Sequence, residues 1–334
     1  MKSEGFSDLY EKRGARIICQ LCRHYCQLKE DQIGLCGVNK NEDGRLKNLV
    51  YGKVSALNID PIEKKPLYHF VPGSTALSLG TVGCNLQCPF CQNWQISQTS
   101  ELDSATEISP ENLVALAQEH GCQTIAYTYN EPTIFYPFAK DIALLAKTQG
   151  IKNIFVSNGM ETPEMIAEMQ EVIDGFNIDL KSFDPEYYKK HLKGTLEGVL
   201  DTLKLLVQKG FWVEVTTLIV PGDNDSDEEL HKMAAFIAEE LGVSIPWHIS
   251  AFSPNYQVKD KPNTPLSTLQ RAKEIGQRHG LHYIYMGNVR SDGSTYCPQC
   301  HTVLIEREGY TVTENRLREG ACPVCQREIE GVWR

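Results

Sequence analysis

Apolar and polar positions alternate in a regular order along the chain from about residue 74 onward. Short runs rich in Val, Ile, Thr and aromatic residues, which are typical of buried strands, recur along this part of the chain. We expect strands at Ala76–Val82, Thr124–Tyr129, Asn153–Ser157, Gly175–Lys181, Trp212–Val220, Pro246–Phe252 and His282–Met286. The intervening runs are amphipathic and predict helices at Pro110–His120, Thr133–Gln149, Pro163–Val172, Leu196–Gln208, Ser226–Leu241 and Pro265–His279.

This strand–helix repetition predicts parallel strands joined by right-handed crossovers. Six or seven such units favour an α/β fold, a partial TIM-like (β/α)6 barrel, over a flat open sheet. Polar residues fall in or just after most of the strands, at the ends where barrels of this type carry their chemistry. The pattern is missing at both ends of the chain. We therefore predict an N-terminal cysteine-rich extension (residues 1–73), the barrel (74–292) and a C-terminal module (293–334).

Composition and charge narrow the classes of function. The net charge is −10 and no basic run is visible, so we expect no nucleic-acid partner. The N-terminus lacks the apolar core of a signal peptide, and no uninterrupted apolar stretch of about 18 residues predicts a membrane span. We expect a cytoplasmic protein without membrane attachment, in a compartment that keeps thiols reduced.

The cysteines are clustered rather than scattered. The three groups are Cys19, Cys22, Cys26 and Cys36; Cys84, Cys88 and Cys91; and Cys297, Cys300, Cys322 and Cys325. Grouped thiols in a reducing compartment indicate metal or iron–sulfur ligation more often than disulfides. Cys122 stands alone and is expected to be a buried, inert thiol.

The central group follows the first predicted barrel strand and has the spacing C-x3-C-x2-C. Three thiolates on a short loop match three corners of a [4Fe-4S] cluster and leave one iron open to bind and activate a substrate. The alternative is a zinc site that lacks a fourth ligand, although zinc sites prefer four ligands and C-x2-C pairs. We expect Cys84, Cys88 and Cys91 to be the ligands of a catalytic cluster.

With this motif the chain resembles the radical S-adenosylmethionine (SAM) superfamily. Within it, the chain is similar to the AmmeMemoRadiSam system radical SAM enzymes, which are related to pyruvate formate-lyase activating enzymes. Besides the cysteine loop, the matching stretches are Asp60–Phe70, Gln92–Trp94, Tyr127–Pro132, Ser157–Gly159, Asp179–Lys181, Pro221–Asn224, His248–Phe252 and Tyr285–Asn288.

The resemblance implies that SAM chelates the open iron through its amino and carboxylate groups. It also implies that Glu131 accepts hydrogen bonds from the SAM amino group, although the family's Gly-Gly-Glu reads Tyr-Asn-Glu here and loses the freedom of two glycines. The other side chains expected around SAM are Phe90 with the strand end Tyr285–Asn288 beside adenine, Ser157 and Asn158 near the ribose or carboxylate, and Asp179 with Lys181. Candidates for the same chamber are His248, Tyr127, Tyr129 and His69.

The expected reaction is reductive cleavage of SAM to methionine and a 5′-deoxyadenosyl radical, which abstracts hydrogen from an unidentified substrate. The resemblance implies an electron donor such as flavodoxin or ferredoxin, and partners with Memo-like and AMMECR-like domains. A glycyl-radical-enzyme activating enzyme is the close alternative. A non-catalytic metal-binding interaction protein is the alternative from another class.

The two outer cysteine groups have different spacings. The C-terminal group forms two C-x2-C knuckles separated by strand-like Val303–Ile305 and Tyr310–Val312, and it resembles a zinc ribbon. An auxiliary Fe–S cluster is the other possibility there. The N-terminal group has the spacing C-x2-C-x3-C-x9-C and is compatible with zinc or with an auxiliary Fe–S cluster, with His24 as a substitute ligand.

Overall fold

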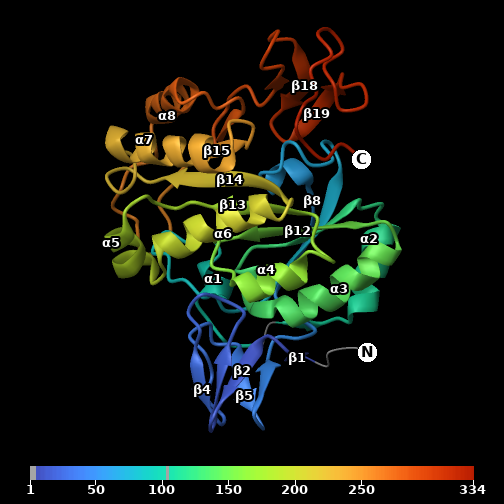
Figure 1. Ribbon diagram of the computed structural model, residues 1–334, viewed down its shortest axis with the longest axis vertical. Helices are drawn as coiled ribbons and strands as arrows, with labels where there is room; N and C mark the ends of the chain where they lie inside the picture. Colours follow the sequence, from blue (N-terminus) through green and yellow to red (C-terminus); the bar gives the residue numbers. More distant parts are fainter. Residues whose placement is uncertain (1–4, 103–104) are drawn as a thin grey trace.

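An eight-stranded sheet runs through the middle of the molecule in the computed structural model, which describes residues 5–102 and 105–334 (Figure 1). Its seven parallel strands are β9 (Thr75–Gly80), β11 (Thr124–Tyr127), β12 (Lys152–Ser157), β13 (Gly175–Asp179), β14 (Trp212–Ile219), β15 (Trp247–Ala251) and β16 (Ile284–Gly287). All seven predicted strands are present, with ends that differ by a few residues. They follow one another across the sheet in the order of the sequence.

Six helices connect these strands, as predicted. They are α2 (Pro110–Glu119), α3 (Tyr136–Thr148), α4 (Pro163–Met169), α6 (Leu196–Gln208), α7 (Asp227–Phe236) and α8 (Leu266–Arg278). Ser109, Thr162 and Ser226 cap three of them, each accepting a hydrogen bond from a backbone N–H in the first turn. The predicted helix from Thr133 begins instead with a 3₁₀ turn, η2 (Pro132–Phe135), and α7 ends in a π-helical turn, η4 (Ile237–Leu241).

Strands that are neighbours both in sequence and in space make the sheet curve in one direction, as in a barrel. The sheet begins at β16 and ends at β8 (Ala56–Pro61), and these two strands do not pair in the described structure. The predicted incomplete barrel is confirmed. Strand β8 runs antiparallel to β9, so the predicted boundary at residue 73 falls between two strands of one sheet.

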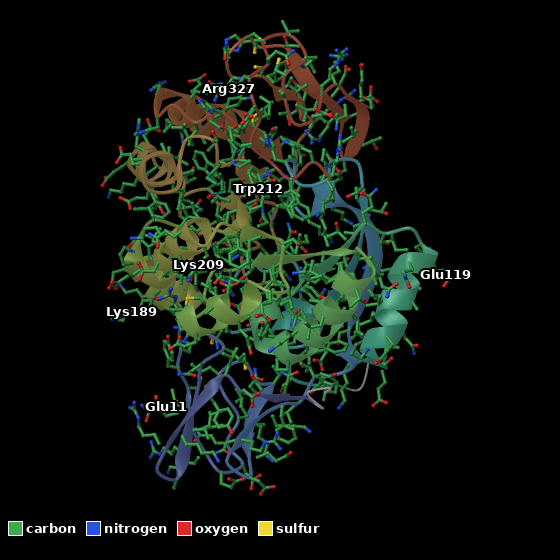
Figure 2. All side chains as sticks on the ribbon, turned by 45° about the vertical axis from the view of Figure 1, so that its right-hand side comes forward. Glu11, Glu119, Lys189, Lys209, Trp212 and Arg327 are labelled. Atoms are coloured by element: carbon green, nitrogen blue, oxygen red, sulfur yellow. The ribbon has the colours of Figure 1, made fainter. Side chains whose placement is uncertain are left out.

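Two smaller β-structures lie at opposite ends of the long axis (Figure 1). The N-terminal lobe contains the sheets β1 (Phe6–Ser7), β6 (Arg45–Asn48), β5 (Asn39–Glu42) and β2 (Tyr10–Arg13), β3 (Arg16–Cys19), β4 (Gln27–Lys29). The C-terminal module contains β17 (Thr295–Tyr296), β18 (Val303–Glu308) and β19 (Thr311–Asn315). Figure 2 shows Glu11 on the first structure, Arg327 on the second and Trp212 between them. The remaining short elements are β7 (Lys53–Val54), paired with β10 (Thr106–Glu107), η1 (Ile62–Lys64), α1 (Trp94–Ser97), α5 (Pro185–Tyr187) and the π-turn η3 (Tyr188–Leu192).

The two end structures are packed differently against the barrel. Apolar residues of the N-terminal lobe, such as Ile17 and Leu28, belong to the same hydrophobic core as the barrel strands. The C-terminal module has a separate small core around Leu304 and Ile305. None of the helices in the described parts of the chain is long and apolar enough to cross a membrane.

Candidate active site

The cysteine loop lies between β9 and α1, directly after the first parallel strand, as the sequence predicts. Gly83 has a left-handed backbone (φ 89°), and a Cβ there would lie 2.5 Å from the carbonyl oxygen of Cys36. Only glycine meets both demands. The loop then turns, with the Cys91 N–H donating to the Cys88 carbonyl at 3.2 Å and the thiol of Cys91 3.1 Å from the hydroxyl of Ser97.

A cavity of about 310 Å³ opens beside this loop, at the carboxyl ends of the parallel strands. Its volume is at the lower end of the range of about 300–1,000 Å³ for small-molecule sites. Of the residues predicted for the site, Cys88, Phe90, Cys91, Asp179, Lys181 and His248 line this cavity. The expected strand end also contributes, through Tyr285, Gly287 and Asn288. Residues that are far apart in the sequence therefore meet at one edge of the sheet.

Asp179 and Lys181 form an ion pair on the cavity wall, with 2.7 Å between Lys181 Nζ and Asp179 Oδ2. Burial by itself would lower the pKa of Lys181, but the negative charge of Asp179 and its hydrogen bond outweigh burial and raise that pKa. The wall therefore carries a fixed positive and a fixed negative charge side by side. Such a pair complements an amino acid, which carries an ammonium and a carboxylate group.

Glu131, Ser157 and Asn158 form a second cluster, which is buried and does not line the cavity. Ser157 Oγ donates to Glu131 Oε1 at 2.9 Å, and the backbone N–H of Asn158 donates to Glu131 Oε2 at 2.8 Å. Thr133 donates to Oε1 as well, through its N–H at 3.0 Å and through its hydroxyl. Both carboxylate oxygens thus already bind protein donors, and they join the start of η2 to the end of β12.

Asn85 connects this cluster to the cysteine loop. The side-chain amide of Asn158 donates to Asn85 Oδ1 at 2.7 Å, while the amide nitrogen of Asn85 is buried without a partner. The thiol of Cys84 lies 3.9 Å from the same Oδ1. Through Asn85, the buried cluster therefore positions Cys84, the first cysteine of the loop.

His248 faces the cavity and is held from behind by Glu214, which the sequence analysis missed. His248 Nε2 lies 2.6 Å from Glu214 Oε2, and the backbone N–H groups of Tyr68 and His69 donate to the same carboxylate at 3.0 and 2.8 Å. Burial would raise the pKa of Glu214, but the bond to His248 and nearby charges lower it below the usual range. Glu214 is a charged residue within the otherwise apolar strand from Trp212, and this position was the sequence signal for a buried partner.

The stretch Asp60–Phe70 builds another wall of the cavity. Glu63, Lys64 and Tyr68 line it, although the sequence analysis assigned them no role. Asp60 holds this segment by accepting hydrogen bonds from Lys65 at 2.7 Å and from the hydroxyl of Tyr129 at 2.7 Å. The sequence signals were the charges and prolines of this stretch and its resemblance to the family. His69 and Tyr127 lie outside the cavity lining.

The donor set fits an iron–sulfur cluster with SAM beside it. Burial raises the pKa of Cys88 to about 11 although Lys181 acts in the opposite direction, so the thiol needs a cation to ionise. Three thiols on one loop leave a fourth coordination position free, and the cavity with its paired charges lies next to two of them.

The outer cysteine groups differ in spacing. In the C-terminal group all four sulfur atoms lie within 4.8 Å of one another. In the described parts of the chain, no other set of three or more His, Cys, Asp or Glu ligand atoms is that compact, so neither the N-terminal group nor the barrel group meets this spacing. The C-terminal module can therefore bind a single metal ion. Cys122 is buried, as predicted.

Comparisons with known proteins agree with this site. The sequence profile described as the Radical SAM superfamily matches residues 78–237. An uncharacterized protein of Methanocaldococcus jannaschii is 40% identical over 320 residues, which cover 94% of this chain and 95% of that protein. The pyruvate formate-lyase 1-activating enzyme of Escherichia coli is 23% identical over 216 residues, which cover 59% of this chain and 87% of that enzyme.

Among solved structures, SuiB of Streptococcus suis bound to S-adenosylmethionine is similar in fold, with a TM-score of 0.51 and 14% identity over 68% of this chain and 52% of that one. A radical SAM methyltransferase of Sphaerobacter thermophilus has a TM-score of 0.50 and 14% identity over 65% of this chain and 67% of that one. The cysteine loop, the incomplete barrel and these relatives together show that the chain belongs to the radical SAM superfamily.

Proposed function

We propose that this protein is a radical SAM enzyme whose [4Fe-4S] cluster is held by Cys84, Cys88 and Cys91. When bound, the cluster supplies one electron to SAM, which breaks into methionine and a 5′-deoxyadenosyl radical that abstracts hydrogen from the substrate. The observation that carries the proposal is the shared cavity, in which two cysteines of the loop lie beside the charged pair of Asp179 and Lys181.

The chain's own residues bind and orient SAM. Lys181 would hold the carboxylate of its methionine part and Asp179 its ammonium group, since these charges are complementary and already fixed. Phe90 and the strand end at Asn288 would enclose the adenine. Glu131 would act mainly by positioning the loop through Ser157 and Asn158, because both of its oxygens bind protein donors. His248, held by Glu214, would face the substrate.

A glycyl-radical-enzyme activating enzyme is the second candidate function. It is favoured by the similarity to the pyruvate formate-lyase 1-activating enzyme and to a putative glycyl-radical enzyme activating enzyme of Methanocaldococcus jannaschii, which is 24% identical over 212 residues. We also propose a cytoplasmic location, a low-potential donor such as flavodoxin or ferredoxin, and partners of the Memo and AMMECR types. The last two partners rest on the resemblance of the sequence to the AmmeMemoRadiSam system alone.

The test uses anaerobically reconstituted protein with dithionite and SAM, and it quantifies 5′-deoxyadenosine. The comparison protein is the triple variant Cys84→Ala/Cys88→Ala/Cys91→Ala, and Cys122→Ser is the matched control for loss of a buried thiol. We expect product from the parent and from the control but none from the triple variant. No product from a parent that carries its full iron and binds SAM would contradict the proposal.

Two variants that each remove one lysine charge sharpen the assignment of the SAM site. Lys181→Met is expected to weaken SAM binding at least about tenfold, because one charge-assisted contact to the carboxylate is lost. Lys190→Met is the control, since Lys190 forms an exposed ion pair with Glu186. Equal SAM affinity of both variants, measured by equilibrium binding to the reconstituted proteins, would remove Lys181 from the site.

A further inference from the structure

The four cysteines of the N-terminal lobe line one enclosed cavity. Cys19 and Cys22 are buried, Cys26 and Cys36 are half-buried, and all four thiols are free. The rest of the wall is mainly apolar, formed by Leu21, Leu28, Leu35 and Ile134, with His24 and Asn39 as polar members. The thiols come from the β3–β4 hairpin and the loop before β5, and the cavity is lined by no carboxylate. Such a set forms a site for a thiophilic metal centre.

The spacing of these thiols distinguishes between a single ion and a cluster. Sulfur atoms around one zinc ion are about 3.8 Å apart, since Zn–S bonds of about 2.3 Å point to the corners of a tetrahedron. The C-terminal cysteines approach this spacing, with all sulfur atoms within 4.8 Å. The N-terminal cysteines do not, although they surround one cavity. A cubane keeps its thiolates further apart, because four irons and four sulfides lie between them.

We propose that Cys19, Cys22, Cys26 and Cys36 bind a second iron–sulfur cluster of the all-cysteine [4Fe-4S] type. With four protein ligands, every iron is occupied, so this cluster transfers electrons and does not bind SAM. The C-x2-C-x3-C-x9-C spacing supplies the four ligands from one segment of the lobe. The barrel loop shares the wider spacing, which is consistent with clusters at both places.

The N-terminal site touches the barrel loop directly. The carbonyl oxygen of Cys36 packs against Gly83, the residue that precedes Cys84. His24, which lines the cavity of the four cysteines, lies with its Nε2 2.7 Å from the carbonyl oxygen of Asn85, the residue that follows Cys84. The segments that carry the two ligand sets are therefore joined through one van der Waals contact and one hydrogen bond, which gives a short route for an electron.

The outer side of the same cavity is accessible. Leu35 lines the cavity and is 72% exposed, and Tyr25 and Ile33 are exposed as well. A protein that carries a low-potential one-electron cofactor can thus approach the N-terminal cluster at the exposed side chain of Leu35.

The electron balance is simple and rests on the proposed function. One reduced flavodoxin gives one electron to the oxidised N-terminal cluster and is itself oxidised by one electron. The N-terminal cluster returns to its oxidised state as that electron passes to the barrel cluster. No bond forms or breaks and no proton moves in this transfer, and the C–S bond of SAM is cleaved only afterwards.

The metal content of two variants tests the site without any activity. The first is Cys84→Ala/Cys88→Ala/Cys91→Ala, which removes the barrel cluster, and the second adds Cys19→Ser/Cys22→Ser. After anaerobic reconstitution we expect about four irons and four sulfides in the first variant and none in the second. Electron paramagnetic resonance of the reduced first variant should show one cluster signal, which the second variant lacks.

Two outcomes would overturn the site. If the first variant contains zinc in place of iron, the N-terminal group is a zinc site. Iron that persists in the second variant would place the cluster elsewhere. Cys36→Ser in the background of the barrel variant replaces one ligand sulfur by oxygen. It guards against misfolding and should alter the cluster signal. Because the barrel cluster is absent from all these proteins, their result is separate from the production of 5′-deoxyadenosine by the parent.

Stopped-flow reduction of the barrel cluster tests the transfer. The ratio of the rate with reduced flavodoxin to the rate with dithionite should fall at least about tenfold when Cys19 and Cys22 are replaced by serine. Dithionite is small and serves as the reference reductant in each protein. An unchanged ratio would show that flavodoxin reduces the barrel cluster directly and would overturn the transfer.

Discussion

The two outer cysteine groups show how the same residue type can form two different kinds of site. The C-terminal group closes a compact set of four thiols inside a module with its own small core. The N-terminal thiols line one pocket without this compact spacing, and their lobe shares the hydrophobic core of the barrel. A module that cannot bury enough apolar surface needs a metal to fold, whereas a lobe fused to a large core can use its ligands for another purpose.

The largest expected effect is at the C-terminal group, where we propose structural zinc. Replacing Cys297 and Cys322 by serine should release about one zinc and unfold the module, because structural zinc contributes about 10–16 kcal/mol of apparent binding free energy in small zinc domains. The measurement is metal analysis together with hydrogen exchange over β18 and β19. Cys122→Ser is the control. Full protection of these strands after zinc loss would contradict the comparison.

Arg307 gives the next largest effect, since it joins the C-terminal module to the cavity wall. Its side chain is fully buried, pairs with Glu63 at 3.3 Å and donates to the carbonyl of Tyr68 at 2.7 Å. Arg307→Ala should cost about 3–5 kcal/mol in the free energy of unfolding, because a buried charge loses its partner. The exposed Arg316, paired with Glu314, is the matched control, and Arg316→Ala should cost less than about 1 kcal/mol. Equal costs in urea unfolding would contradict this account.

The third effect is the pH dependence of the free energy of unfolding at another contact of the C-terminal module, which His69 makes. His69 lies between the carbonyl of Glu330 (2.8 Å) and the hydroxyl of Tyr285 (2.7 Å), and burial lowers its pKa to about 4. The unfolded chain binds a proton there below about pH 6.5, and the folded chain does not. The stabilisation is therefore complete above pH 6.5 and is lost as the pH falls towards 4, by up to about 3 kcal/mol.

Urea unfolding of the parent and of His69→Phe between pH 4 and 7 measures this effect. The difference in free energy between the two proteins should shrink as the pH falls. A difference that stays constant over this range would show that His69 does not titrate in the way its burial demands.

The smallest effect concerns the N-terminal side. His24→Phe removes the hydrogen bond to the carbonyl of Asn85 and should cost about 1 kcal/mol in the free energy of unfolding. The iron content should stay unchanged, because His24 is not one of the four proposed ligands. Tyr25→Phe, which removes an exposed bond to Glu164, is the control. Loss of iron in His24→Phe alone would make His24 a ligand and would change the comparison.

Much of the fold could be predicted because its strands are regular. Seven runs of buried residues at intervals were recognisable, and Ser109 with Pro110 marked the start of a helix. Strand β8 was not predicted because it is an exposed antiparallel edge strand with polar residues. It forms because its backbone pairs with β9, which the local sequence does not indicate. Helix α7 ends in a π turn for which the sequence offers no signal.

The candidate site divides in the same way. The cysteine loop could be found because its chemistry is visible in residue type and spacing, and Asp179 with Lys181 followed from the resemblance to the family. Glu214 could not be paired with His248 from the sequence, since the two residues meet only when β14 and β15 lie side by side. Glu131 lies outside the cavity lining because it bonds to Ser157 and Asn158 at the end of β12, and this contact also depends on the tertiary structure.

The sequence by itself determined the superfamily, the order of strands and helices, and the three groups of thiols, because these follow from local periodicity and from ligand spacing along the chain. Only the tertiary structure decided which thiols are close enough for one ion and which line a pocket at larger spacing. It also placed Cys36 against Gly83 and Arg307 against Glu63. The physical reason is that distances between residues far apart in the sequence are set by packing, which no local pattern encodes.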